Sequence, residues 1–479
     1  MSKTRNKVIK NFIWRFIERV GAQGVSLVVS WILARILGRE VYGTLALVLV
    51  FTNIMQVLVD SGLGNALIQK KDADHLDFSS VFFFNLGTCV ILYIIMFISA
   101  PYIAAFYKTS ELTQLIRVGS LIIVISGIKN VQQAYVSRNL IFKKFFFATL
   151  GGTLGAAVIG IWMALHGFGV WSYVAQMLFN ASIDTFILWI TVKWRPKWEF
   201  SFERIKGLFA YGWKLLVSAL LNTGFENIRS LVIGRVDSKE GLASFNKGQQ
   251  LPQFVINNIN TSISSVLLPV MSEEQDDVSR IKSMTRRAIK TSTYFIAPAM
   301  LGLAACGKAF ILLTIGEEWL PTLPFLVIFC IAYIFYPIAT ANLNAMMAMG
   351  RSDLFLKLEI IKKSANIIIL LLTYKHGIMA IAYGFLVTEF IGQVVNIWPN
   401  KRLIGYSYVE QLMDILPAVA LATVMGICVY SMNFLGLNMI LTFVLQIFVG
   451  VAIYVLGSMM FKFDTFSYAL GIIRDWKKK

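Results

Sequence analysis

The sequence is poor in charged residues, which make up 15% of its 479 positions, while hydrophobic residues make up 57%. Soluble domains carry about a quarter of their residues as charges, so this composition excludes an ordinary soluble core. With three histidines, a His-based metal site is not expected, and none of the four cysteines has CxxC spacing, so neither a zinc site nor a disulfide framework is predicted. A phosphate-binding loop ending in Lys-Ser/Thr and an HExxH motif are both absent. We therefore expect no enzyme, no catalytic residues, no metal and no bound cofactor.

Long apolar runs recur from one end of the sequence to the other. A membrane-spanning helix needs about 20 mostly apolar residues, and the runs reach that length repeatedly. They predict an all-α polytopic membrane protein with about 14 transmembrane helices. The predicted spans are 12–36, 41–67, 79–100, 115–137, 145–165, 169–193, 207–233, 251–271, 288–312, 321–349, 354–374, 377–399, 412–432 and 438–461.

The net charge is +18, from 44 Lys and Arg against 26 Asp and Glu. In a soluble protein such an excess would suggest nucleic acid as a partner. Here most of the basic residues fall in segments on the side of the N-terminus, as the positive-inside rule requires of cytoplasmic loops. We therefore expect both termini in the cytoplasm, membrane lipids as the surroundings and no nucleic-acid partner.

Two short patterns occur twice along the chain. The charged tag "ARILGRE" (34–40) returns as "GRVDSKE" (234–240), and "HGFGVWSY" (166–173) returns as "HGIMAIAY" (376–383). In each case six predicted spans separate the copies, so both copies have the same orientation. The two tags should then lie at the same membrane face, each paired locally with its own basic neighbours.

These echoes predict two six-helix halves related by a pseudo-two-fold axis along the membrane normal. Internal repeats with the substrate site between them are typical of secondary transporters. The predicted divisions are an N-terminal lobe, a C-terminal lobe, and two added helices with a basic cytoplasmic tail, at residues 1–200, 201–400 and 401–479. The link "KWRPKWEFSFERIK" (193–206) mixes aromatic and basic residues, which suits either an amphipathic interfacial segment or a plain solvated linker.

Polar and ionisable residues inside the spans are the candidates for function, because they are costly in lipid unless they face a cavity or a partner. The seventh span places Lys214, Ser218 and Asn222 on one helical face, which favours either a water-filled lumen or a hydrogen-bonded seam. The candidate contacts for an anionic, sugar-bearing substrate are Arg117, Lys129, Lys214, Asn222, Arg229, Asn257 and Asn258. The candidates for charge balance or ion coupling are Asp60, Asp184, Glu226 and Glu389.

Five stretches of the chain resemble a known family: "DSGLGNALIQKKD" (60–72), "QQAYVSRNLIFKKF" (132–145), "HGFGVWSYVAQ" (166–176), "NIRSLVIGR" (227–235) and "LLPVMSEEQDD" (267–277). In this order they are similar to the Wzx-type polysaccharide transporters, including the WzxC and teichuronic-acid branch. These belong to the multidrug/oligosaccharidyl-lipid/polysaccharide (MOP) exporter superfamily. The resemblance implies a fold like that of MATE and MurJ proteins. Related sequences often have Asp where this chain has Arg229, so a carboxylate-based ion site is not carried over to that position.

The resemblance also implies an activity. Such proteins are flippases that move an oligosaccharide on undecaprenyl pyrophosphate across the bacterial inner membrane by alternating access, through a basic lumen. The implied partners are that lipid-linked oligosaccharide and, along the pathway, glycosyltransferases and a polymerase, with H⁺ or Na⁺ as possible coupling ions. Two alternatives remain open, a cation-coupled multidrug exporter of the same superfamily and a membrane enzyme of the same pathway.

Overall fold

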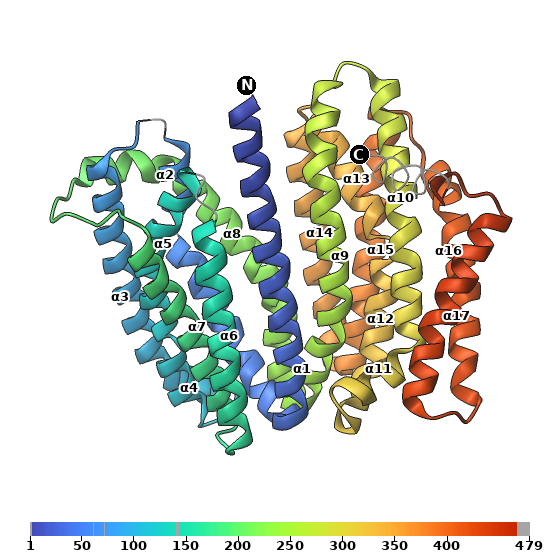
Figure 1. Cartoon of the computed structure of the whole chain (residues 1–479), viewed down its shortest axis with the longest axis horizontal. Helices are drawn as coiled ribbons and strands as arrows, with labels where there is room; N and C mark the ends of the chain where they lie inside the picture. Colours follow the sequence, from blue (N-terminus) through green and yellow to red (C-terminus); the bar gives the residue numbers. More distant parts are fainter. Residues whose placement is uncertain (1, 61, 71, 140–142, 467–479) are drawn as a thin grey trace. The chain divides into compact units, whose positions relative to one another are not determined.

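The computed structural model describes residues 2–466 except 61, 71 and 140–142, and within these ranges the chain is helical and without strands (Figure 1). The predicted all-α class is confirmed. Its α-helices are α1 (Ser2–Asp60), α2 (Leu63–Gln69), α3 (His75–Phe106), α4 (Leu112–Gly119), α5 (Leu121–Arg138), α6 (Lys143–Leu165), α7 (Val170–Thr191), α8 (Phe202–Val236), α9 (Lys239–Glu273), α10 (Val278–Ala305), α11 (Gly307–Thr314), α12 (Leu323–Tyr333), α13 (Tyr336–Ala348), α14 (Ser352–Thr373), α15 (Ile378–Leu403), α16 (Tyr408–Ser431) and α17 (Met439–Met460).

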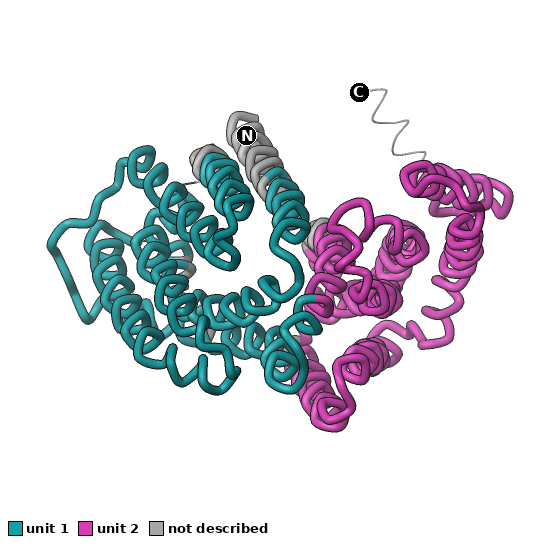
Figure 2. The backbone as a smooth tube through the Cα atoms, turned by 90° about the horizontal axis from the view of Figure 1, so that it is seen from below, with its two compact units in different colours: residues 1–243 teal, residues 244–479 magenta. Residues whose placement is uncertain are grey.

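Several of these helices are suited to a membrane. In the described part of the chain, eight are long and apolar enough to cross one, and a ninth span results if the bent pair α10–α11 counts as one. The protein is therefore a multi-pass membrane protein, and the figure of fourteen spans stays a prediction. Packing divides the chain into two compact units, residues 1–243 and 244–479, coloured separately in Figure 2. The lobe boundaries drawn from the sequence repeat stay predictions.

Glycines mark the ends of the first two predicted spans of unit 1. Gly38 has a φ of 74° and breaks α1 inside the first charged tag, between the predicted spans 12–36 and 41–67. The predicted span 41–67 ends earlier than expected, at Asp60, because Gly62 follows with a left-handed φ of 69° and starts the short helix α2. Glycine takes this conformation without the steric penalty that a Cβ would bring. The chain can therefore change direction between α1 and α2 because residue 62 is a glycine.

The two charged tags meet at one end of unit 1. The Lys239 ammonium of the second copy lies 3.7 Å from the Glu40 carboxylate of the first. A Cβ on Gly43 would come within 2.1 Å of the Lys239 carbonyl oxygen, so the backbones touch there. The tags lie at the same end, as expected. The expectation of purely local pairing was wrong for Glu40, because its partner belongs to the other copy.

Small residues let α6 and α7 pack closely. Cβ atoms placed on Gly152, Gly155 and Gly160 would lie 2.7–2.9 Å from side-chain atoms of α7. Membrane helices associate through such small-residue surfaces because apolar side chains gain little by leaving lipid for each other. The glycine-rich face of α6 is therefore a packing surface, which fixes α7 and the charged residue it carries.

Four helix starts repeat between the units. Asp74 caps α3 and Asp277 caps α10, and each carboxylate accepts from the third backbone N–H of its helix at 2.9 and 3.0 Å. Ser201 caps α8 and Ser407 caps α16 in the same manner. Side-chain caps of this kind satisfy backbone donors that a helix end leaves open. The cap pairs recur at nearly the spacing of the sequence echoes, so the starts of α10 and α16 repeat those of α3 and α8 along the sequence.

The link between α7 and α8 is extended and bound along α3. Trp194 is buried against Phe78 and Phe82, and the backbone of the link donates to the Ser79 hydroxyl. Trp198 stacks on Phe83 of α3, with ring centroids 5.1 Å apart, and is 95% exposed. The aromatic side chains of the link thus pack on α3 while Trp198 leaves apolar surface exposed, which agrees with the amphipathic interpretation rather than with a plain solvated linker.

Two predicted spans of unit 2 are interrupted. The ninth, 288–312, is bent by 68° at the break between α10 and α11, where Cys306 lies. The tenth, 321–349, is divided into α12 and α13, with Pro337 in the first turn of α13. Proline lacks the N–H that would continue the preceding helix. These breaks are local events that an average over an apolar window does not register.

Candidate functional site

The polar face predicted on α8 is partly present. Ser218, Asn222 and Glu226 are exposed and lie one turn apart along the helix. Arg229, one turn further, is buried with 9% of its surface exposed. The side chain of Lys214 lies outside the described residues. Polar groups at i, i+4 on a membrane helix require water or polar partners on that side, so this face of α8 is the candidate surface for a polar cargo.

The asparagines of α9 divide between exposure and packing. Asn257 is exposed, whereas Asn258 donates to the Phe254 carbonyl of its own helix at 2.8 Å. Asn260 is 7% exposed, and neither amide atom has a hydrogen-bond partner in the described structure. Unsatisfied buried amides cost free energy, so this helix carries polar groups that packing alone does not explain.

Lys129 and Asp184, expected to serve different purposes, form one ion pair. The Lys129 ammonium on α5 lies 2.7 Å from an Asp184 carboxylate oxygen on α7. Their side chains are 17% and 12% exposed, and the second Asp184 oxygen has no hydrogen-bond partner among the described residues. Removing either partner would leave a buried charge uncompensated. The pair therefore ties α5 to α7, and Lys129 is committed to a carboxylate of its own unit.

The remaining candidates are distributed over several helices. Arg117 on α4 donates to the Phe97 carbonyl at 3.2 Å, with its guanidinium 4.2 Å from the Phe97 ring centroid. This anchors α4 on α3 and supplies a local role for Arg117. Glu389 is partly exposed on α15, and the side chain of Asp60 lies outside the described residues. The structure thus brings together Lys129 and Asp184, while Arg117 and Glu389 lie elsewhere.

Polar residues of the tenth predicted span belong to a buried network. Asn342 is fully buried and donates to the Gln411 side chain at 2.8 Å. Asn400 donates to the Asn342 side-chain oxygen at 2.6 Å, and Asn344 donates to Ser264 at 3.0 Å. These amides join α13 to α9, α15 and α16. The hydrogen bonds of Asn342 and Asn344 therefore hold helices together.

Two of the stretches that carry the family resemblance meet at one end of unit 1. Arg138, from "QQAYVSRNLIFKKF", donates through Nη1 to the carbonyls of Leu67 and Lys70 at 2.6 and 2.5 Å. These carbonyls belong to "DSGLGNALIQKKD" and lie at the C-terminal end of α2. Because helix C-termini leave carbonyls unsatisfied and carry partial negative charge, the guanidinium both caps and neutralises this end.

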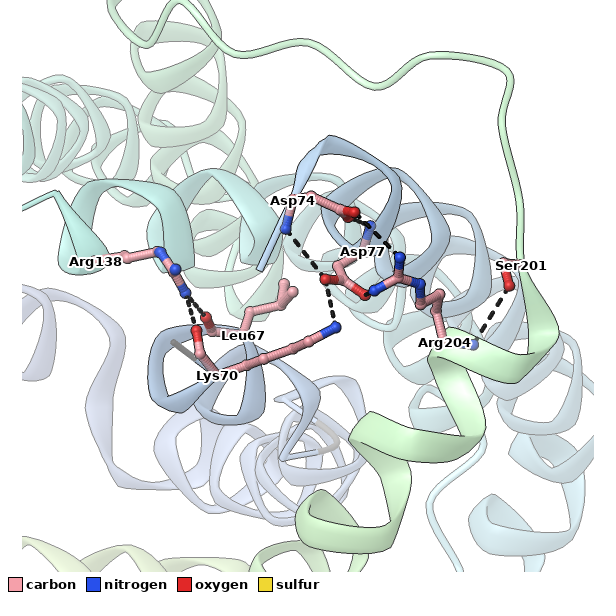
Figure 3. A network of polar contacts seen from close by, with 7 residues as sticks. All are labelled: Leu67, Lys70, Asp74, Asp77, Arg138, Ser201 and Arg204. Carbon is pink, nitrogen blue, oxygen red and sulfur yellow. Dashed lines mark hydrogen bonds and ion pairs between the residues drawn. The ribbon is translucent and has the colours of Figure 1, made fainter. Parts of the chain in front are cut away.

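The same cluster holds the start of α8, as Figure 3 shows. Lys70 lies 2.6 Å from the fully buried Asp77 carboxylate, and Arg204 lies 3.3 Å from Asp74 and 3.6 Å from Asp77. Four charges, two of each sign, thereby join α2, α3 and α8. The sequence carried signals for this joint, since Asp74 and Ser201 are typical N-cap residues, but the partners are far apart along the chain.

A glycine pair completes the contact of α2 with α8. A Cβ on Gly62 would lie 2.2 Å from the Gly212 carbonyl oxygen, and one on Gly212 would lie 3.1 Å from the Gly62 carbonyl carbon. The backbones therefore approach too closely for any side chain at Gly62. The glycine-rich part of "DSGLGNALIQKKD" is therefore a packing surface that sets the position of α8 and its polar face.

A polysaccharide biosynthesis protein family model matches residues 32–324, which include all of the helices that form this joint. The chain belongs to the polysaccharide biosynthesis protein family. It is 24% identical to the teichuronic acid biosynthesis protein TuaB of Bacillus subtilis over 80% of each chain. It is 23% identical to the lipopolysaccharide biosynthesis protein WzxC of Escherichia coli over 88% of each. The resemblance drawn from the sequence motifs is confirmed.

The fold is that of a solved flippase. The structure of the lipid II flippase MurJ in an inward closed conformation aligns with a TM-score of 0.77 at 17% identity, covering 94% of this chain and 98% of that one. At this identity the likeness concerns the fold alone, and it confirms the MurJ-like architecture predicted from the sequence. Within the described part of the chain, no group of three or more His, Cys, Asp or Glu residues is placed so that it could hold a metal ion.

Proposed function

We propose that this protein is a flippase that moves a lipid-linked oligosaccharide from the inner to the outer leaflet of a bacterial cytoplasmic membrane by alternating access. The observation that carries the proposal is an exposed polar face on α8, with Asn222 and Glu226 on it, in a multi-pass member of a polysaccharide biosynthesis family. A sugar headgroup offers hydroxyls that amide and carboxylate side chains bind. The lipid tail needs no such surface, because it stays in the bilayer.

The headgroup we propose is carried on undecaprenyl pyrophosphate. A diphosphate cannot leave water without cationic partners, since uncompensated charges are costly in a low-dielectric environment. The proposal places the pyrophosphate contacts at Arg229 and Lys214, because both cations lie on α8, the helix that carries the exposed polar face. Arg117 and Lys129 instead hold α4 to α3 and α5 to α7. Arginine suits this task because its guanidinium binds phosphate through two parallel hydrogen bonds.

We further propose that transport is coupled to protons through Asp184. A Lys129 ammonium 2.7 Å from the carboxylate already fills the place that a sodium ion would need. A proton can be taken up by the carboxylate once conformational change separates the pair. With the basic segments facing the cytoplasm, both termini lie there, and the glycosyltransferases and the polymerase of the same pathway act before and after this step.

The test is flipping of a fluorescent polyprenyl-pyrophosphate oligosaccharide by the purified protein in vesicles. Losing a charge-assisted hydrogen bond costs about 1.5–3 kcal/mol, so Arg229→Gln should slow flipping by about tenfold or more. Arg235→Gln is the matched control, because Arg235 lies on the same helix with its guanidinium over Phe106, and its rate should stay within about twofold of wild type.

The outcomes separate the parts of the proposal. If folded Arg229→Gln and Lys214→Gln proteins flip at the wild-type rate, the pyrophosphate contacts are wrong. If the wild-type protein moves no lipid-linked oligosaccharide but confers resistance to cationic drugs when overproduced, the chain is a multidrug exporter of the same fold. Formation of new glycosidic bonds by the purified protein would instead point to an enzyme.

A further inference from the structure

The inference concerns a cluster of charges where α10 and α16 begin in unit 2, and it does not depend on the proposed function. Asp414 on α16 is 4% exposed at its side chain. Arg286 on α10 binds both of its oxygens, through Nε and Nη2, at 2.7 Å. Lys290 lies 3.2 Å from one oxygen, and the Tyr406 hydroxyl donates to the other at 2.7 Å. One carboxylate thus holds two cations.

A second ion pair extends the cluster without removing its excess charge. Lys282 lies 3.0 Å from Glu410 and also donates to the Gly405 carbonyl at 2.6 Å. In these described ion pairs, Lys282, Arg286 and Lys290 face only Glu410 and Asp414. The basic cluster, defined as these five residues, therefore keeps one positive charge beyond what its carboxylates balance.

The ion pairs of the joint in unit 1 are balanced. There Lys70 and Arg204 meet Asp74 and Asp77, and the neighbouring Arg138 donates to two backbone carbonyls at the end of α2. A joint of this design therefore forms with balanced charge. The second cation on Asp414, Lys290, shares a carboxylate that Arg286 already binds at two points, so it can also bind an anion from outside the chain.

The surroundings of the basic cluster indicate what kind of anion. Arg286 and Lys290 are 49% and 35% exposed at their side chains. On the adjoining first turns of α16, the exposed side chains are aliphatic: Val409, Leu412, Met413 and Leu416, at 51–69%. Helix α16 is apolar enough to cross a membrane, so these side chains face acyl chains. Half-exposed cations at the start of such a span lie at the depth of lipid headgroups.

We propose that the basic cluster binds the phosphate of an anionic membrane phospholipid, whose acyl chains lie along Leu412, Met413 and Leu416. The Arg286 guanidinium has five N–H groups, and Asp414 engages only those on Nε and Nη2; the two on Nη1 are directed elsewhere. Lys290 likewise has donors beyond the one it gives to Asp414. Basic sites between membrane helices on the cytoplasmic side bind anionic headgroups in this manner.

The test measures binding of phosphatidylglycerol to the full-length protein in detergent by native mass spectrometry, against phosphatidylcholine as the neutral lipid. Wild-type protein should retain phosphatidylglycerol preferentially. Lys290→Gln leaves the two-point Arg286–Asp414 contact in place, so the fold is kept, and the preference should fall by about fivefold, the worth of one basic residue at a membrane surface. Arg286→Gln should lower it further. Arg280→Gln removes another cation of α10, one that pairs with Glu274 in the turn before the helix, and should leave the preference unchanged.

Two results would overturn the assignment. One is an equal preference for phosphatidylglycerol in the wild type and in a folded Lys290→Gln protein. The other is binding of undecaprenyl pyrophosphate at the cluster, sensitive to Lys290→Gln, without any binding of phosphatidylglycerol, because the phosphate would then come from the carrier lipid of transport. Preference for phosphatidylglycerol that is lost in Lys290→Gln and kept in Arg280→Gln supports the phospholipid site.

Discussion

Breaking the Lys129–Asp184 pair tests the interior of unit 1. Lys129→Met removes the ammonium 2.7 Å from the carboxylate and leaves Asp184 buried, with no hydrogen-bond partner described for its other oxygen. Removing one partner of a buried pair costs about 3–5 kcal/mol. For a unit of this size, 1 kcal/mol shifts the melting temperature by about 2–4 °C, so we expect Tm to fall by roughly 10 °C.

The double variant Lys129→Met/Asp184→Leu removes both charges and replaces them with apolar groups. Such replacements of buried pairs are close to neutral or even stabilising, so most of the lost Tm should return. The assay is thermal unfolding of the detergent-purified proteins, followed by intrinsic fluorescence. Two results would refute the reasoning, because the two charges would then not depend on each other. One is a double variant with a Tm as low as that of Lys129→Met, and the other is a Lys129→Met protein with the Tm of wild type.

The same double variant separates a structural pair from a coupling site. If protons move through Asp184, the stable double variant should still flip lipid-linked oligosaccharide in vesicles but should no longer respond to an imposed pH gradient. Wild-type protein should flip faster with the gradient than without it. A gradient response that survives in the double variant would assign proton coupling to another residue and leave the pair with a purely structural role.

Three further predictions concern the contacts of α2 and the helix caps of both units. Gly62→Ala adds a clash with the Gly212 carbonyl to the roughly 1–2 kcal/mol cost of a left-handed residue. It should therefore lower Tm more than Gly167→Ala, because Gly167 has a similar φ but open space around it. Equal shifts in Tm would contradict the close approach. Arg138→Gln should destabilise by about 1–3 kcal/mol and expose α2 to limited proteolysis, an effect absent if its carbonyl contacts are unimportant. Backbone N–H donors hold the pKa of Asp74 and Asp277 below 3.8. Both caps should therefore persist down to that pH and weaken only as the pH falls through the lowered pKa values. Hydrogen exchange of the capped amides measures this, and protection lost near pH 5 would contradict the caps.

The helical class and the resemblance to a transporter family could be read from the sequence because they depend on averages. Apolar runs such as 79–100 and 377–399 correspond to single helices, α3 and α15, since hydropathy reports whether a segment suits lipid. Breaks within spans were missed because one residue decides them. Gly62 redirects the chain through its φ and its contact with Gly212, and neither leaves a trace in an apolar window.

The site was predicted less well because polarity along a helix does not tell what each polar side chain faces. Asn342 and Asn222 are both asparagines within predicted spans, yet Asn342 is fully buried in hydrogen bonds between helices, while Asn222 is exposed. Lys129 and Asp184 were both recognised as candidates, but their pairing joins segments 55 residues apart. Partners at such distances become visible only when the helices are placed side by side.

The central claim, translocation of a lipid-linked oligosaccharide, is tested most directly in cells. The measurement is the leaflet that holds the lipid-linked glycan, determined with a membrane-impermeant reagent that labels sugars on intact and on broken spheroplasts. Deleting the gene should leave the glycan accessible only after the membrane is broken, and the wild-type chain expressed from a plasmid should restore labelling of intact spheroplasts, while the folded Arg229→Gln protein should not. Labelling of intact spheroplasts at the wild-type level in the deletion strain would contradict the account.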